Sequence, residues 1–330
     1  MTWLITGGAG FVGAHVVEAL RRTGDEVVVL DDLSTGDATR LDPGVPLIQG
    51  SVHDAELLRR TFGRYDVRGV VHLAARKQPG DSVERPLFYY RENLGGLGTL
   101  LEQMVAHDID ALVFSSSAAV YGDQSVDVMT EDLRPAPSSP YGETKLAGEW
   151  LLADVARTHT LRYLALRYFN AAGCGRPELA DSGVFNLIPM VFERLTQGKP
   201  PLVFGTDYPT PDGTTIRDYI HVADLASAHV AAVRHLESGA DARLVLNVGT
   251  GVGTSTRELI DTILDVTGYG GDPAYRPIEV DRRPGDPAVS IASPARITAE
   301  LGWSASHGVP DMVESAWQGW IRTHPEAVRE

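Results

Sequence analysis

The chain has 330 residues, of which 43% are hydrophobic, and this length exceeds what one compact domain usually needs. Its formal net charge of -15 argues against partners that bind basic surface, so we expect no nucleic acid and no anionic membrane among them. No apolar run approaches the ~20 residues of a membrane span, no secretory signal is visible, and Cys174 is the only cysteine. We therefore expect a cytoplasmic protein without a disulfide or a metal site.

The first half of the chain alternates short β-branched runs with segments of helical periodicity. Strands are predicted at 3–6, 26–30, 45–48, 69–73, 111–115 and 163–167, and helices at 13–22, 56–61 and 139–156. This alternation is typical of an α/β fold with a doubly wound parallel (Rossmann) sheet.

The second half is richer in glycine and proline, with loops at 173–183, 198–213 and 282–287. We expect a smaller, loop-rich C-terminal domain at 171–330 beside a Rossmann domain at 1–170. A helix at 221–237 and a strand at 244–249 return to the α/β pattern. The segment 217–249 is therefore expected to rejoin the first domain, which makes the predicted boundary interleaved.

A glycine-rich turn follows the first predicted strand and opens an amphipathic helix. Gly7, Gly10 and Gly13 have the spacing that lets a backbone approach a pyrophosphate, and the helix N-terminus offers free amides to it. The second strand ends at Asp31, where a carboxylate can accept from the adenine ribose and repel a 2′-phosphate. The pattern predicts a dinucleotide site that prefers NAD over NADP.

Tyr141 and Lys145 are four residues apart and would share one helix face. Pro140 suits the first helical position, so Tyr141 would lie in the first turn, and Lys145 is expected to lower its pKa. Ser117 follows the fifth strand, and ligands of open α/β sheets bind beyond such carboxyl ends. A phenol, an ammonium and a hydroxyl together indicate proton transfer at a substrate hydroxyl or carbonyl. A surface Tyr–Lys pair and a serine turn are the alternatives.

Together, these motifs resemble the extended short-chain dehydrogenase/reductase family and, within it, the UDP-glucose 4-epimerases. The resemblance covers almost the full length, in separated blocks at 7–15, 31–36, 72–90, 115–124, 139–145 and 167–170. Its most specific block is 204–222, because a general dinucleotide fold would not require that sequence.

The resemblance implies 4-epimerisation of a UDP-hexose, UDP-galactose to UDP-glucose, with tightly held NAD and a transient 4-keto intermediate. The implied catalytic residues are Ser117, Tyr141 and Lys145. The implied cofactor contacts are Gly7, Gly10, Phe11, Val12, Gly13, Asp31, Asp32, Ser51, Val52, Leu73, Ala74, Ala75, Lys77, Asn93, Ser115, Tyr141, Lys145 and Tyr168. The implied UDP-sugar contacts are Lys77, Ser117, Tyr141, Asn170, Asn186, Leu187, Phe204, Arg217, Tyr219, Arg283, Asp286 and Ser290.

Two positions depart from the family pattern. Ser51 replaces the usual aspartate that touches adenine, although Asp54 lies nearby. Ser290 aligns with a bulky tyrosine that lines the sugar pocket in some members. Because serine leaves more room, N-acetylated sugars are expected to be accepted as well.

Other activities remain to be weighed. Ala118 and Ala119 occupy the place where sugar-nucleotide 4,6-dehydratases carry an acidic residue, which disfavours dehydration. Epimerases of UDP-xylose or UDP-glucuronate share the same catalytic residues and stay open. A non-catalytic NAD(H) sensor would not need Ser117, Tyr141 and Lys145 together.

The family resemblance also implies a homodimer, formed by pairing helices from 87–106 and 139–156. His15, His72 and His221 lie in or beside apolar elements without metal-type spacing, so we predict structural roles for them.

Overall fold

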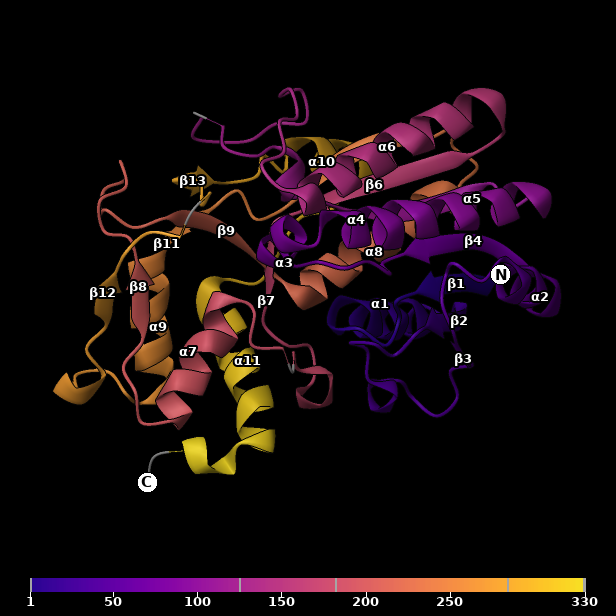
Figure 1. Cartoon of the computed structure of the whole chain (residues 1–330). Helices are drawn as coiled ribbons and strands as arrows, with labels where there is room; N and C mark the ends of the chain where they lie inside the picture. Colours follow the sequence, from indigo (N-terminus) through magenta and orange to yellow (C-terminus); the bar gives the residue numbers. More distant parts are fainter. Residues whose placement is uncertain (1, 125, 182, 284, 329–330) are drawn as a thin grey trace.

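The centre of the molecule is a parallel sheet. The computed structural model describes residues 2–124, 126–181, 183–283 and 285–328, and within them seven strands pair in the order β10-β6-β5-β4-β1-β2-β3 (Figure 1). The strands are β1 (Thr2–Thr6), β2 (Glu26–Asp31), β3 (Leu47–Gln49), β4 (Val67–His72), β5 (Ala111–Ser117), β6 (Arg162–Tyr168) and β10 (Arg243–Val248). The predicted doubly wound parallel sheet is confirmed.

The chain winds outward from β1 in both directions. It runs through β2 and β3 on one side and through β4, β5, β6 and β10 on the other. The strand order therefore reverses between β1 and β4, and the carboxyl ends of the strands at such a switch point form a crevice for a ligand.

Helices cover both faces of the sheet because successive strand side chains point in opposite directions. Ile5 packs in one core with α1 (Phe11–Arg22) and α8 (Val222–Glu237). Its neighbour Leu4 packs in a second core with side chains of the opposite layer of helices. Those helices are α2 (Ala55–Tyr65), α5 (Gly96–Ala106) and α6 (Pro140–Thr158).

A helical segment leads from β4 into α5. It consists of α3 (Pro79–Glu84), α4 (Pro86–Tyr89) and the π-helical turn η2 (Tyr90–Gly95), which continues directly into α5. The π-helical turn contacts α6, so this segment lies against the helix that carries Tyr141 and Lys145.

The remaining part of the chain forms small sheets and a separate helical core. Its strands are β7 (Asn170–Ala172), β8 (Leu202–Phe204), β9 (Ile216–His221), β11 (Gly253–Ser255), β12 (Ile278–Val280) and β13 (Val289–Ser290). The helices of the separate core are α7 (Leu187–Thr196), α9 (Thr256–Thr267) and α11 (Val309–Thr323), which lie side by side (Figure 1). The fourth helix, α10 (Ala295–Leu301), packs instead against β10 and α8. Phe192, Leu259 and Trp320 are buried in the separate core.

Element positions agree with the sequence to within a few residues. The helix predicted at 139–156 is α6, with Ser139 as its N-cap and Pro140 in its first turn. The predicted strand at 244–249 is β10, which pairs with β6. No helix among the described residues is long and apolar enough to cross a membrane.

Candidate active site

The glycine turn after β1 is held in a conformation that other residues would disturb. Gly7 has φ of 72°, in the left-handed region, and a Cβ there would lie 2.7 Å from the Ala74 amide nitrogen. A Cβ at Gly13 would clash with the Gly7 carbonyl oxygen. The turn therefore needs glycine at both positions to bring β1, α1 and the chain after β4 this close together.

The N-terminus of α1 is open to a ligand. Gly10 is its N-cap and supplies no side-chain acceptor, and no acidic residue lies in the first turn. The amides of this turn consequently lack side-chain partners and face the switch point of the sheet. This arrangement fits a dinucleotide pyrophosphate.

Asp31 ends β2 as a buried, fixed carboxylate. Its Oδ2 accepts from the Ala9 amide and its Oδ1 from the Leu33 amide, both at 2.9 Å. The remaining lone pairs lie beside the cofactor cavity, where they can accept from ribose hydroxyls and would repel a 2′-phosphate. The residues present thus fit NAD.

A cavity of about 590 Å³ extends along the carboxyl ends of the strands. The predicted cofactor residues that line it are Gly7, Gly10, Phe11, Val12, Gly13, Asp31, Asp32, Ser51, Val52, Leu73, Ala74, Ala75, Lys77, Tyr141, Lys145 and Tyr168. The other two predicted cofactor residues, Asn93 and Ser115, do not line the cavity. Asn93 Nδ2 donates to Thr144 Oγ1 at 3.0 Å, and the Ser115 carbonyl binds Lys145.

Tyr141 and Lys145 lie one turn apart at the start of α6, and both are buried. Lys145 Nζ donates to the Ser115 carbonyl at 2.8 Å and lies 5.9 Å from the centroid of the Tyr141 ring. Ser117 is half-buried at the end of β5, and its Oγ also accepts from the Ala119 amide at 3.2 Å. All three residues meet at one edge of the sheet.

Burial controls the protonation of this group. Burial raises the pKa of Tyr141, and a hydrogen bond with the Ser117 hydroxyl opposes that rise. Burial lowers the pKa of Lys145 to about 8, while the Glu149 carboxylate opposes the fall. The sequence predicted that Lys145 would lower the pKa of Tyr141. In the structure the group that opposes the rise is the Ser117 hydroxyl, and the Lys145 ammonium donates to the Ser115 carbonyl.

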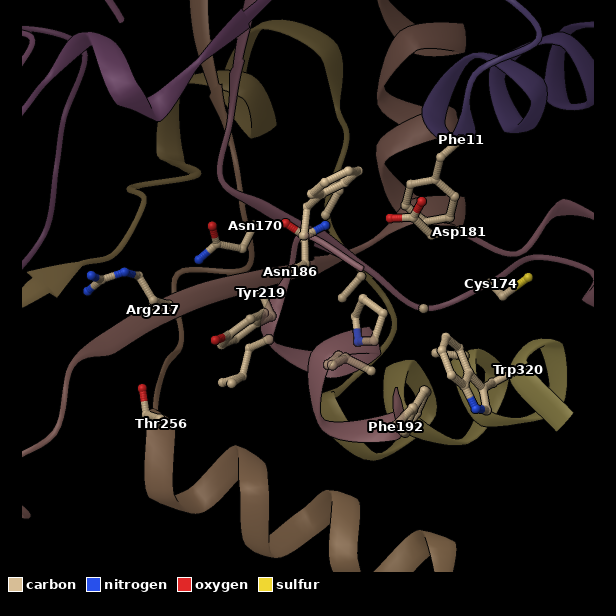
Figure 2. A pocket seen from close by; sticks show the side chains of 18 of the residues that line it. Phe11, Asn170, Cys174, Asp181, Asn186, Phe192, Arg217, Tyr219, Thr256 and Trp320 are labelled. Carbon is tan, nitrogen blue, oxygen red and sulfur yellow. The ribbon is translucent and has the colours of Figure 1, made fainter. Parts of the chain in front are cut away.

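Figure 2 shows a second cavity, of about 210 Å³, which shares lining residues with the first. The predicted UDP-sugar residues that line it are Asn170, Asn186, Leu187, Phe204, Arg217, Tyr219, Arg283 and Asp286. In Figure 2, Asn170, Arg217 and Tyr219 lie toward one end of this cavity, and Cys174 and Trp320 lie toward the other.

The polar end of the second cavity carries paired charges. Arg217 lies 3.8 Å from Asp286, and the Arg283 guanidinium stacks on the Phe204 ring at 3.9 Å from its centroid. Two guanidinium groups at this end can bind a diphosphate, and the carboxylate can accept from a ribose. Ser290 is outside the lining but pairs with Arg217 across β13 and β9.

The two cavities adjoin each other, because three residues line both. Phe11, Asp181 and Phe185 belong to each lining. Tyr141 and Lys77 line the cofactor cavity, whereas Ser117 is in neither lining. A ligand in the second cavity would therefore approach the N-terminal start of α6, where Tyr141 lies.

Comparison with known proteins identifies the family. The model of the NAD dependent epimerase/dehydratase family matches residues 3–249, well over half of the chain. The chain belongs to this family. The predicted cofactor, NAD, and the predicted class of protein, an enzyme, are thereby confirmed.

Members of the family with high identity support the predicted resemblance. A curated UDP-glucose 4-epimerase from Azospirillum brasilense is 42% identical over 329 residues, which cover 98% of the chain and 93% of the relative. A structure of UDP-glucose-4-epimerase from Stenotrophomonas maltophila, with bound NAD and formylated UDP-arabinopyranose, has a TM-score of 0.92 at 37% identity, covering 99% and 100% of the two chains. A structure of UDP-glucose 4-epimerase from Bifidobacterium longum, in complex with NAD⁺ and UDP, has a TM-score of 0.90 at 35% identity and also covers 99% and 100% of the two chains.

Some lining residues of this family member were not predicted. Arg76 and Arg40 line the cofactor cavity, Asp181 and Phe185 line both cavities, and Trp320 lines the second. Asp181 lies inside the loop predicted at 173–183 and Phe185 just after it; the loop carries no recognisable motif, so the positions of these two residues depend on the folded chain. Within the described residues, no group of three or more His, Cys, Asp or Glu side chains is arranged to hold a metal.

Proposed function

We propose that the chain interconverts UDP-galactose and UDP-glucose by 4-epimerisation. One observation carries the proposal: the cofactor cavity lined by Tyr141 and Lys145 shares lining residues with a second cavity, which has Arg217 and Arg283 at its polar end. A proton-transfer group is thus adjacent to a diphosphate-type site. The 42% identical UDP-glucose 4-epimerase from Azospirillum brasilense supports the same assignment.

The chain's own residues would handle the proton and the sugar's position. Tyr141 would take the proton of the sugar's 4-hydroxyl. Ser117, whose hydroxyl pairs with the Tyr141 phenol, would hold the 4-hydroxyl in place. Lys145 would supply a positive charge at the same edge of the sheet. NAD, when bound, supplies a reversible oxidant for the carbon that bears the hydroxyl.

Epimerisation requires that the sugar presents both faces to the same oxidant. Arg217, Arg283 and Asp286 would hold the nucleotide and diphosphate, while the sugar turns between the two cavities. Once the sugar has turned, the hydrogen taken from this carbon would be returned to its other face, and Tyr141 would give its proton back to the oxygen, so that the opposite configuration would form.

The test is a reaction without added NAD. Purified protein is incubated with UDP-galactose, and nucleotide sugars are separated and identified by nuclear magnetic resonance. We expect UDP-glucose to form without net change in NADH absorbance. Accumulation of NADH would indicate a dehydrogenase, and a 4-keto-6-deoxy sugar would indicate a dehydratase.

We also propose that N-acetylated UDP-hexoses are accepted. Ser290 lies opposite Arg217 in the β13–β9 pair, next to the polar end of the second cavity, and its side chain is small. Parallel reactions with UDP-N-acetylglucosamine test this point. The proposal fails if that sugar is unchanged while UDP-galactose turns over normally, and Ser290→Tyr is expected to remove the N-acetyl activity selectively.

Epimerases of UDP-xylose or UDP-glucuronate remain the alternative, since they would use the same Ser117, Tyr141 and Lys145. Parallel reactions with those sugars distinguish them. A non-catalytic NAD(H) sensor is the least favoured alternative, and absence of turnover with every sugar would support it.

A homodimer and a cytoplasmic location belong to the same proposal. Large apolar side chains are exposed on neighbouring helices, with Leu87 on α4 at 85%, Val83 on α3 at 63% and Trp150 on α6 at 61%. Leu87 and Trp150 lie in the segments predicted to pair, 87–106 and 139–156, whereas Val83 on α3 precedes the first of them. A cluster of this kind favours a protein–protein contact. The cytoplasmic location stays a prediction from the sequence.

A further inference from the structure

The loops after β4 and β2 stand on either side of the glycine turn. The order β4-β1-β2 places β1 between them, so the turn at Gly7 to Gly13 lies between the two loops at the carboxyl ends of the strands. A dinucleotide pyrophosphate bound at that turn would pass between them. Any direct contact between the two loops would therefore cross the path of the cofactor.

Arg76 makes such a contact. It follows β4, and its Nη1 donates to Ser34 Oγ at 2.6 Å, 42 residues away in the loop after β2. Its Nη2 lies 3.3 Å from Asp32 Oδ2 and 3.6 Å from Glu92 Oε2. Arg76, Asp32, Ser34 and Glu92 all line the cofactor cavity.

The backbone at Arg76 is fixed from behind. Its amide donates to Asn93 Oδ1 at 2.7 Å, and its carbonyl accepts from Asn93 Nδ2 at 3.0 Å. The same Asn93 amide donates to Thr144 on α6. The guanidinium consequently extends from a rigid base, and its side chain is only 24% exposed.

We propose that Arg76, bound to Ser34 and Asp32, forms a strap across the cofactor cavity that retains NAD between turnovers. NAD can leave only after the strap opens. The strap holds the cofactor by closing the exit, so it is a positioning device and takes no part in proton transfer. An epimerase needs such retention, because its cofactor is restored in every cycle and has no reason to exchange.

The size of the effect follows from the contacts. The ion pair with Asp32 is partly exposed and weak by itself, but the short hydrogen bond from a charged donor to Ser34 adds to it. We expect removal of the guanidinium to accelerate NAD release by about threefold to tenfold. Because exposed charges are screened, release from the unmodified protein should also quicken as salt rises from about 0.05 to 0.5 M.

The experiment measures exchange of bound NAD in the holoenzyme without any sugar, so it does not depend on the proposed substrate. Protein purified with its cofactor is mixed with excess radiolabelled NAD, and incorporation is followed over time. The variants are Arg76→Leu, Ser34→Ala and their combination. Arg85→Leu is the matched control, since Arg85 also lines the cavity and stacks on Phe88, while its ion-pair partner is the nearby Asp81 of α3 and no residue of the loop after β2.

The strap predicts faster exchange in Arg76→Leu and in Ser34→Ala, no further acceleration in the double variant, and less than about twofold change in Arg85→Leu. Unchanged exchange in Arg76→Leu would overturn it. Fast exchange in Arg76→Leu with normal exchange in Ser34→Ala would also overturn it, because Arg76 would then act by contacting NAD directly. If the accelerations of the two single variants multiplied in the double variant, Arg76 and Ser34 would act independently, and this result would also overturn the strap.

Discussion

The Glu149 carboxylate on α6 accepts a hydrogen bond from Ser116 Oγ on β5 at 2.5 Å. Glu149 lies one turn after Lys145, and Ser116 lies between Ser115, which binds Lys145, and Ser117. The same carboxylate receives Arg167 Nε at 2.9 Å and Nη2 at 2.6 Å. This buried contact therefore fixes the catalytic helix against the strand that carries Ser117.

Replacing Glu149 with glutamine is expected to weaken both the fold and the site. The Arg167 guanidinium would lose its charge partner in the interior, so we expect the free energy of unfolding to fall by about 3 kcal/mol. The pKa of Lys145 would drop below its value of about 8, because Glu149 is the group that opposes its desolvation. The fall of kcat at alkaline pH should then begin at a lower pH than in the unmodified enzyme.

The measurements for this variant are urea unfolding and a pH profile of kcat. Glu300→Gln, at an exposed position of α10, is the control and should change neither. A Glu149→Gln enzyme that is less stable but keeps its alkaline limit would show that Glu149 supports the fold without influencing Lys145.

Replacing Tyr141 with phenylalanine should remove turnover and leave the fold intact. The ring stays in its buried place, while the only group proposed to take the 4-hydroxyl proton is gone. General base catalysis contributes typically about 10²-fold to 10⁴-fold, so kcat should fall by at least that range.

Bound NAD and the far-ultraviolet circular dichroism of the Tyr141→Phe protein should match those of the unmodified protein. Tyr65→Phe, at the end of α2, serves as the control. Near-normal turnover by Tyr141→Phe would contradict the assigned role.

Local motifs were readable in the sequence because neighbouring residues determine their geometry. The glycine turn, Asp31 at the end of β2 and Tyr141 after Pro140 each depend on a strand end or a helix start that the surrounding pattern indicates. The fold class followed from the same alternation of elements.

Contacts between distant segments could not be predicted in this way. Arg76 meets Ser34 across 42 residues, and Arg167 meets Glu149 from a neighbouring strand, because the sheet order brings them together. The protonation of Lys145 likewise depends on its burial and on a carbonyl of β5, and neither is visible in the spacing of Tyr141 and Lys145.

Acid should destabilise the protein through its buried histidines. Burial lowers the pKa of His72 to about 3 and that of His15, His221 and His229 to about 4, from the ordinary value of 6.5. Between pH 6.5 and these values the unfolded chain binds more protons than the folded one, so stability falls as pH falls. Each histidine contributes up to about 1.4 kcal/mol per pH unit in that window.

His229 offers a test of this slope. It is enclosed between the Leu225 carbonyl, 2.9 Å from Nδ1, and the Ser115 hydroxyl, 3.2 Å from Nε2. Urea unfolding at pH 7 and pH 5 should give a smaller difference for His229→Gln than for the unmodified chain. His159→Gln, at an exposed position, should keep the full difference, and an unchanged slope in His229→Gln would rule out its contribution.

The exposed apolar side chains of the helices predict how the protein assembles. Trp150 on α6 and Leu87 on α4 are 61% and 85% exposed, and burying them against a second copy would remove a large apolar area from water. Trp150→Glu would place a charge in that contact, so we expect its mass by light scattering to fall from a dimer to a monomer. Val252→Glu changes an equally exposed apolar residue after β10 and should leave the dimer intact. A monomeric unmodified protein would refute the dimer, and a dimeric Trp150→Glu protein would exclude this face as its interface.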